Sequence, residues 1–322
     1  MIPQTIAQTE SLAFGHWIAE VDDLINREIL ECFPRSWSED FISYKWLLAL
    51  TRRFRHVTIA DLDLPFTVSW DAYKADGAIE TRYGDIGVIV NFSFSVRSKI
   101  ATATGVGFLE AKRIDAKGGN YPHMEWEQLR REASNIAGHR VLLYDFEDVN
   151  EASLNLQALG FCQHLDAAPF GSVHATVAIT QHVLAVKDRS RSIGALGIPL
   201  GYQLCARYLR GLDLDYTLDP ATIFENIPGG TGYLIVANVE ESGTTKKRGQ
   251  PVPSGYSPIH EKQVQTWAMD GQTTPLQVEQ AAASDELDLS DLIEQFNQNP
   301  LLRRGPELIE DEEEPGAPTV GV

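Results

Sequence analysis

The chain opens with two segments whose apolar residues recur at helical spacing. The first such stripe runs up to Pro34, which cannot continue a helix, so we expect a helix from about residue 10 to 31. A second helix is expected over residues 37–53, because Ser36 and Glu39 have the spacing of a capping box with Ser36 at the N-cap. The first helix forms an extension that packs its apolar stripe on the domain that follows.

Short apolar runs rich in β-branched residues then indicate strands. Residues 66–104 read as strands, with turns at residues 75–77 and around residues 93–99. Within and after this region, residues 86–90 and 105–113 each suit a buried strand. We therefore expect these two runs to lie in the interior of a sheet.

The next elements alternate in type. Pro122 suits the first turn of a helix and Gly138 the position just past its end, so they bracket a predicted helix that includes residues 128–136. Residues 140–144 follow as a strand.

The second half of the chain continues in the same way. Residues 176–186 alternate like a strand, residues 199–210 read as a helix that ends at Gly211, and residues 233–239 read as another strand. No linker-like stretch separates these elements from the first half, so we expect them to extend the same sheet.

Charged residues stand at the ends of two predicted strands. Glu110 and Lys112 are two residues apart, so their side chains project from the same face of one strand. Asp85 begins the preceding apolar run, and it comes close to Glu110 if the two strands are neighbours. Asp71 and Asp76 stand beside turn signals, where aspartates usually bond locally, and a local turn is also the alternative for Asp85. Two carboxylates and an ammonium group at a sheet end suit a hard divalent cation and an activated water.

This pattern, an Asp followed after a strand and a turn by Glu-x-Lys, resembles the PD-(D/E)XK (restriction-endonuclease-like) nuclease superfamily. The predicted order over residues 36–150 is similar to that family's core of helix, three strands, helix and strand, with residues 66–70 as the first strand. The resemblance implies an α/β fold with a central mixed β-sheet flanked by helices, in a nuclease-like domain of residues 36–240. An N-terminal helical extension (residues 1–35) precedes it, and a flexible basic loop with a disordered acidic C-terminal tail (residues 241–322) follows.

The resemblance also implies roles for individual residues. Asp85 and Glu110, with Glu39 and the Ala111 carbonyl, would hold Mg²⁺ or Mn²⁺, and Lys112 would orient an attacking water. A capping role is the alternative for Glu39. The implied reaction is hydrolysis of a phosphodiester bond in DNA. Relatives in prokaryotic defence and mobile-element systems suggest, by analogy alone, an antiviral role.

Several polar residues are secondary candidates. Some family members carry a Gln near the site on the second core helix, which points to Gln128, although the Tyr that often follows four residues later is Glu132 here. The alternative for Gln128 is a solvated helix position. Candidates for contact with DNA are Arg113, Lys117, Arg130 and Arg131. The last two have the alternative of pairing with Glu127 and other neighbours on the helix surface.

The net charge of −18 argues against a general nucleic-acid coat, but the acids are unevenly spread. Residues 285–314 hold 11 acids and 2 bases, which is half of the net charge, whereas residues 36–150 hold 16 acids and 14 bases. The core composition therefore neither excludes nor favours a polyphosphate substrate. Three well-separated cysteines, no signal pattern and no apolar run of bilayer length predict a cytoplasmic protein with reduced thiols and no membrane partner.

The C-terminal region is the candidate for contacts with partners. We expect residues 270–322 to be largely disordered, except for an acidic amphipathic segment at residues 287–296. That segment is a candidate docking site for a protein partner, a second copy of the chain or the protein itself. Residues 310–314 are acidic enough to mimic nucleic acid, and residues 242–249 form a basic loop that is a candidate phosphate contact.

A nuclease is therefore the expected function, and two rivals stay open. One is a non-catalytic binding or scaffold subunit on the same fold, which engages a protein partner through its acidic surface and tail. The other is a nuclease silenced by its own tail. The sequence has no phosphate-binding GxxxxGK[ST] loop and no GxSxG nucleophile turn. One loose group of metal-binding residue types fits no zinc pattern: Cys162, His164, His174 and His182.

Overall fold

The computed structural model describes nine segments of the chain, residues 11–12, 14–59, 65–76, 83–96, 99–149, 151–152, 171–220, 231–241 and 255–260. Contacts divide the chain after Ser284 into two units, and every described residue lies in the first. The predicted basic loop, the acidic tail with its two special segments, Cys162 and His164 lie outside the described residues. Among the described helices, none combines the length and apolarity needed to cross a bilayer.

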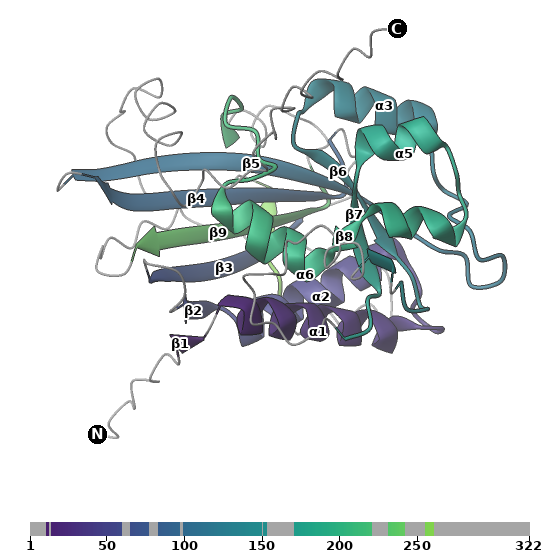
Figure 1. Ribbon diagram of the computed structural model, residues 1–322, viewed down its shortest axis with the longest axis horizontal. Coiled ribbons are helices and arrows are strands. Elements are labelled where there is room, and N and C mark those ends of the chain that lie inside the picture. The colour runs from purple at the N-terminus through teal and green to yellow at the C-terminus, as the bar shows by residue number, and fades with distance from the viewer. Residues whose placement is uncertain are drawn as a thin grey trace, which may run out of the picture. The chain divides into compact units, whose positions relative to one another are not determined.

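The described strands form one mixed sheet in the order β1-β2-β3-β9-β4-β5-β6-β7-β8, and β10 pairs with β3 (Figure 1). Their bounds are β1 Ser11–Leu12, β2 His56–Ile59, β3 Phe66–Ala75, β4 Ile86–Val96, β5 Lys99–Arg113, β6 His139–Tyr144, β7 Ala175–Ile179, β8 Ile198–Pro199, β9 Tyr233–Glu241 and β10 Tyr256–Pro258. Because helices flank this open sheet, the α/β class and the mixed central sheet are confirmed.

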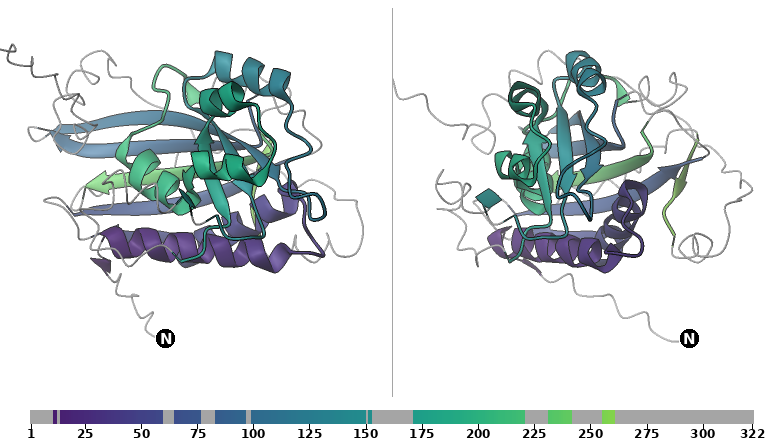
Figure 2. Two further views of the ribbon diagram at one scale, coloured as in Figure 1. Left: turned by 45° about the vertical axis from the view of Figure 1, so that its right-hand side comes forward. Right: turned by 90° about the vertical axis from the view of Figure 1, so that its right-hand side faces the viewer.

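Helices cover both faces of the sheet. Figures 1 and 2 show α1 and α2 along one face and α3 and α5 along the other. The helical segments are α1 Phe14–Cys32, α2 Glu39–Arg53, α3 Trp126–Asn135, α5 Thr180–Val186, η1 Arg191–Leu196, α6 Leu200–Tyr202, η2 Gln203–Arg207 and η3 Tyr208–Arg210. On the α3 face, Val106 and Phe108 of β5 pack with Ile136 just after the helix. On the other face, the hydroxyl of Tyr144 in β6 bonds Ser43 of α2 at 2.9 Å.

The centre of the sheet combines strands that are far apart in the sequence. β4 and β5 form a long antiparallel hairpin. The helix α3 then connects β5 to β6, and these two strands are parallel. β9 lies between β3 and β4, antiparallel to the first and parallel to the second. The strand predicted at residues 233–239 therefore does not extend the sheet at an edge but forms part of its middle.

Two strand predictions were wrong in extent. Of the turn expected around residues 93–99, residues 93–96 and residue 99 are strand, because Ser93 and Ser95 continue the ladder of β4 against Thr102 and Ile100 of β5, whereas residues 97–98 lie outside the described residues. Residues 180–186, expected as strand, form the helix α5. The strand β7 ends at Ile179, which is paired near the start of β6, so no ladder is left for the next residues.

Two predicted helix starts were also wrong. The N-cap of α2 is Ser38 and not Ser36, and the Ser38 hydroxyl accepts a hydrogen bond from the Phe41 N–H at 3.3 Å. α3 begins at Trp126 with Glu125 as its N-cap, so Pro122 lies in the preceding turn. By contrast, the helix expected before Pro34 is present as α1, which ends at Cys32.

Candidate active site

Asp85 lies where β5 runs past the start of β4. Ile86 pairs with Leu109, so the residue before it lies opposite Glu110. The Asp85 Oδ2 atom accepts a hydrogen bond from the Ala111 N–H at 2.8 Å. Gly84 allows this close approach, because it has a φ of 120° and an added Cβ would lie 2.9 Å from the Leu109 carbonyl oxygen.

Glu110 and Lys112 project from the same face of β5, as the alternation of a strand requires. Both side chains are buried, with 1% and 7% of their surface exposed. The Lys112 ammonium donates to Oε1 of Glu110 at 2.5 Å. The structure therefore brings together the three residues predicted from separate strands, Asp85, Glu110 and Lys112.

The two carboxylates are strained electrostatically. Burial, followed by repulsion from Asp85, raises the pKa of Glu110 to about 8. Burial raises the pKa of Asp85 to about 6, although Lys112 and the Ala111 N–H oppose that shift. Burial lowers the pKa of Lys112, but the two carboxylates more than compensate, so its pKa lies above the ordinary value. The site therefore holds a fixed cation and two acids that would accept further positive charge.

The helix α3 adds two polar side chains to this group. The Gln128 amide donates from Nε2 to Glu110 Oε1 at 2.8 Å and to Glu132 Oε1 at 3.0 Å. Gln128 is thus not the solvated residue of the alternative interpretation. Glu132, fully buried, was not predicted as part of the site. Its position three residues after Leu129 and four before Ile136, in the apolar stripe, is the signal that could have revealed it.

Glu39 reaches the same end of the sheet from the first residue of α2. Its Oε1 atom accepts the Arg113 N–H at 3.0 Å, and the N-cap of its helix is Ser38. Its negative charge still contributes to the raised pKa of Asp85. Glu39 therefore lies beside the candidate site. The backbone of β5, the strand that carries Glu110 and Lys112, holds its side chain in place.

The candidate DNA contacts differ in their surroundings. Arg130 pairs with Glu127 at 2.5 Å, which matches the alternative interpretation for that residue. Arg131 and Lys117 are exposed, and Arg113 is half-buried at the end of β5. The aspartates that were set aside have other partners. Asp71 lies 3.9 Å from Arg55, and Asp76 accepts a hydrogen bond from Ser257.

The two carboxylates fit a hydrated divalent cation better than a closed metal cage. Within the described segments, no group of three or more His, Cys, Asp or Glu side chains is arranged to hold a metal ion. Mg²⁺ commonly uses one or two carboxylates and keeps several waters, so it does not require such a group. The buried Oε2 atom of Glu110 has no hydrogen-bond partner in the structure, which leaves it available as a ligand. The donor set of Asp85 and Glu110 is therefore compatible with Mg²⁺ or Mn²⁺.

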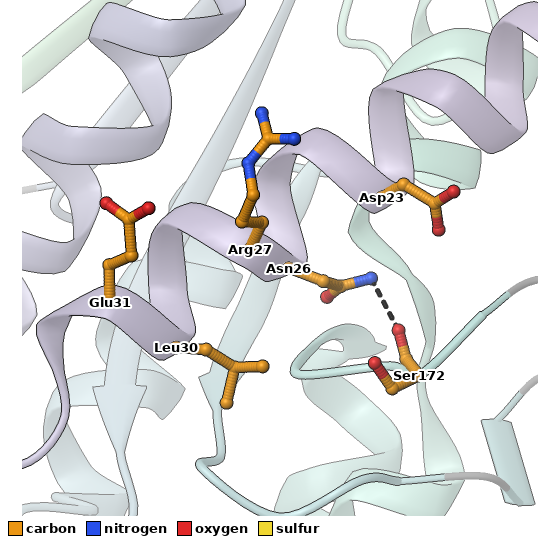
Figure 3. A pocket seen from close by; sticks show the side chains of 6 residues that line it. All are labelled: Asp23, Asn26, Arg27, Leu30, Glu31 and Ser172. Carbon is orange, nitrogen blue, oxygen red and sulfur yellow. Dashed lines mark hydrogen bonds between the residues drawn. The ribbon is translucent and has the colours of Figure 1, made fainter.

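A buried histidine and a shallow pocket lie apart from this site. His174, from the loose His and Cys group, is buried and its Nδ1 atom lies 3.2 Å from the Asp145 carbonyl oxygen. A shallow pocket of about 430 Å³ lies on α1, and the Asn26 amide donates to the Ser172 carbonyl oxygen at 2.8 Å there (Figure 3). Its lining comprises Asp23, Asn26, Arg27, Leu30, Glu31 and Ser172. None of these residues belongs to the Asp85 group.

No protein-family model, curated protein or solved structure matches this chain. The function of the chain is therefore inferred from its own side chains.

Proposed function

We propose that the protein is a Mg²⁺- or Mn²⁺-dependent nuclease that hydrolyses phosphodiester bonds of DNA. The observation that carries this proposal is the meeting of Asp85, Glu110 and Lys112 at one end of the central sheet. A buried carboxyl group that only stabilises the fold is usually paired with a cation of its own. Here two buried acids of raised pKa share a single lysine. Perturbed pKa values of this kind are typical of functional sites.

The arrangement of elements supports the same proposal. The order α2, β2, β3, β4, β5, α3 and β6 contains the helix, three strands, helix and strand of the restriction-endonuclease-like core, with β2 as an additional strand after α2. In the antiparallel β4–β5 pair, the Asp and the Glu-x-Lys lie at neighbouring positions. The next strand, β6, is parallel to β5. The insertion of β9 between β3 and β4 is a departure from a simple three-strand order, so we assign the core by its β4–β6 part.

Each residue then has a role that follows from its contacts. Asp85 and Glu110, with the Ala111 carbonyl, would hold the cation. When bound, the cation supplies a lowered pKa for water and stabilises the negative charge that grows on the phosphoryl oxygens. Lys112 keeps its proton, because its pKa is raised, and therefore acts as a hydrogen-bond donor to the attacking water or a phosphoryl oxygen. Gln128 holds Oε1 of Glu110 in place. Arg113, beside this group, would contact the DNA backbone.

The test is cleavage of supercoiled plasmid DNA by the purified full chain with Mg²⁺ or Mn²⁺. Glu110→Gln and Lys112→Met should each lower the rate by about 100- to 1,000-fold, the usual effect of removing one preorganised group. Glu127→Gln and Lys99→Met are matched controls, because both side chains are exposed, and both should cleave like the parent. Cleavage that persists unchanged in the two site variants would contradict the proposal.

A non-catalytic binding subunit on the same fold is the second candidate. The observation that favours it is the direct ion pair between Lys112 and Glu110, which occupies one of the carboxylate oxygens. The net charge of −18 also suits a protein partner better than DNA. This candidate predicts that the parent is as inactive as the site variants on plasmid, single-stranded DNA and RNA.

A further inference from the structure

A buried row of polar side chains extends from Glu110 away from the candidate site. Gln128 contacts Glu132, and the Glu132 Oε2 atom lies 3.4 Å from Nε2 of His139 at the start of β6. The Nδ1 atom of His139 lies 2.9 Å from the hydroxyl of Thr180, the first residue of α5. Glu132, His139 and Thr180 have no exposed surface. Four separate elements, β5, α3, β6 and α5, thus contribute to one continuous row.

The hydrogen bonds between Thr180 and His139 fix the orientation of the His139 ring. The Thr180 hydroxyl donates to the His139 carbonyl oxygen at 3.0 Å, so it can only accept from Nδ1 of the same histidine. That contact leaves Nε2 facing the Glu132 carboxyl group, where neither Nε2 nor the Oε2 atom of Glu132 has a hydrogen-bond partner in the structure. The other Glu132 oxygen then accepts from Gln128.

Packing alone does not account for Glu132. The residue lies between Leu129 and Ile136 on the inner stripe of α3, where an apolar side chain would avoid the cost of burying a carboxyl group. Its contact with Gln128 has a specific consequence. An amide has a donor end and an acceptor end, and the acceptor oxygen of Glu132 binds only the donor end. Glu132 therefore makes Gln128 present N–H groups, and not its carbonyl oxygen, to Glu110.

We propose that Glu132 and His139 are positioning residues that orient Gln128, so that Gln128 holds Oε1 of Glu110 and leaves Oε2 directed to the ligand. This inference rests on the proposed function for what Oε2 binds, but the orientation of the amide can be measured without any activity. Groups that hold a ligand from behind typically change metal affinity by about 10- to 100-fold when they are removed.

The primary experiment follows the side-chain amide of Gln128 by NMR in the ¹⁵N-labelled full chain. Its signals are assigned by their loss in Gln128→Met. We expect slow exchange of these amide protons with water in the parent and at least about tenfold faster exchange in Glu132→Leu. Glu132→Gln should restore slow exchange, because its carbonyl accepts from Gln128 while its amide donates to His139. Unchanged exchange in Glu132→Leu would overturn the proposal.

A second variant, Thr180→Val, tests the same proposal if Glu132→Leu does not fold. Thr180→Val removes the hydroxyl that fixes His139 and keeps the side-chain volume, so it should also speed the exchange of the Gln128 amide. If Glu132→Leu does not fold, Thr180→Val decides, and slow exchange in that variant overturns the proposal.

Calorimetric binding of Mn²⁺ separates this inference from the proposed function. We expect Glu132→Leu to bind Mn²⁺ about 10- to 100-fold more weakly than the parent and Glu132→Gln to bind like the parent. If Mn²⁺ binds, is lost in Glu110→Gln, and is unaffected by Glu132→Leu, the positioning role is overturned and the metal site stands. If the parent does not bind Mn²⁺, the proposed function fails, and the exchange of the Gln128 amide still decides how that side chain is held.

Discussion

Replacing Glu110 by Gln should change how the stability of the protein depends on pH. The pKa of Glu110 is about 8 in the folded protein against an ordinary value of 4.5, so the folded state keeps a proton that the unfolded chain has lost over this range. A raised carboxyl pKa stabilises the folded state at low pH, and that stability is lost as the pH rises toward 8. From about pH 5.5 to 8, the linkage relation gives a loss of about 3 kcal/mol.

Glu110→Gln removes this titration and keeps nearly the same volume. The free energy of unfolding of the variant, relative to the parent, should therefore rise by about 3 kcal/mol between about pH 5.5 and pH 8. The comparison across pH cancels the pH-independent cost of the lost contact with Lys112.

Urea unfolding followed by circular dichroism, at both pH values and without divalent cations, measures these free energies. Glu127→Gln is the control, because that side chain is exposed and should give the pH dependence of the parent. Equal pH dependence in Glu110→Gln and the parent would show that Glu110 does not hold a proton in the folded state, and the electrostatic description of the site would be wrong.

Three further predictions follow from the same structure. Ser38→Ala should lower the free energy of unfolding by about 1 kcal/mol, whereas Ser36→Ala should leave it unchanged in the same urea titration. Gly201→Ala should destabilise the protein by about 1–3 kcal/mol in thermal unfolding, because its Cβ would lie 2.7 Å from Cβ of Asp22; an unchanged melting temperature would contradict that contact. Mn²⁺ affinity, measured by calorimetry, should rise about tenfold per pH unit between about pH 6 and pH 8, since binding must release the proton held by Glu110; pH-independent affinity would refute this.

The candidate site could be predicted from local rules, because strand alternation alone puts Glu110 and Lys112 on one face. Asp85 needed only the further assumption that its strand is the neighbour, which the hairpin of β4 and β5 supplies. The contact between Glu132 and His139 could not be predicted in this way. Their contact joins α3 to β6 across the packed face of the sheet, and neither residue lies in a sequence pattern that identifies the other as its partner.

The errors in the fold have the same origin. Thr180 and Val183 have β-branched side chains that favour a strand, but Ile179 already pairs near the first residue of β6, which offers no further ladder. Ser36 and Ser38 are both acceptable caps by composition, and the first turn of α2 selects the second. The central place of β9 depends on its pairing with β3 and β4, and the sequence of an apolar strand does not specify which strands it pairs with.

The position of β9 also sets the order in which the protein can mature on the ribosome. The Tyr233 N–H donates to the Asp85 carbonyl oxygen at 2.9 Å, so the strand that fixes this residue is synthesised long after Lys112. At translation speeds of about 5–20 residues per second, the delay is on the order of ten seconds. A nascent or prematurely terminated chain that lacks β9 would carry all three charged groups without the hydrogen bond that Tyr233 donates to Asp85.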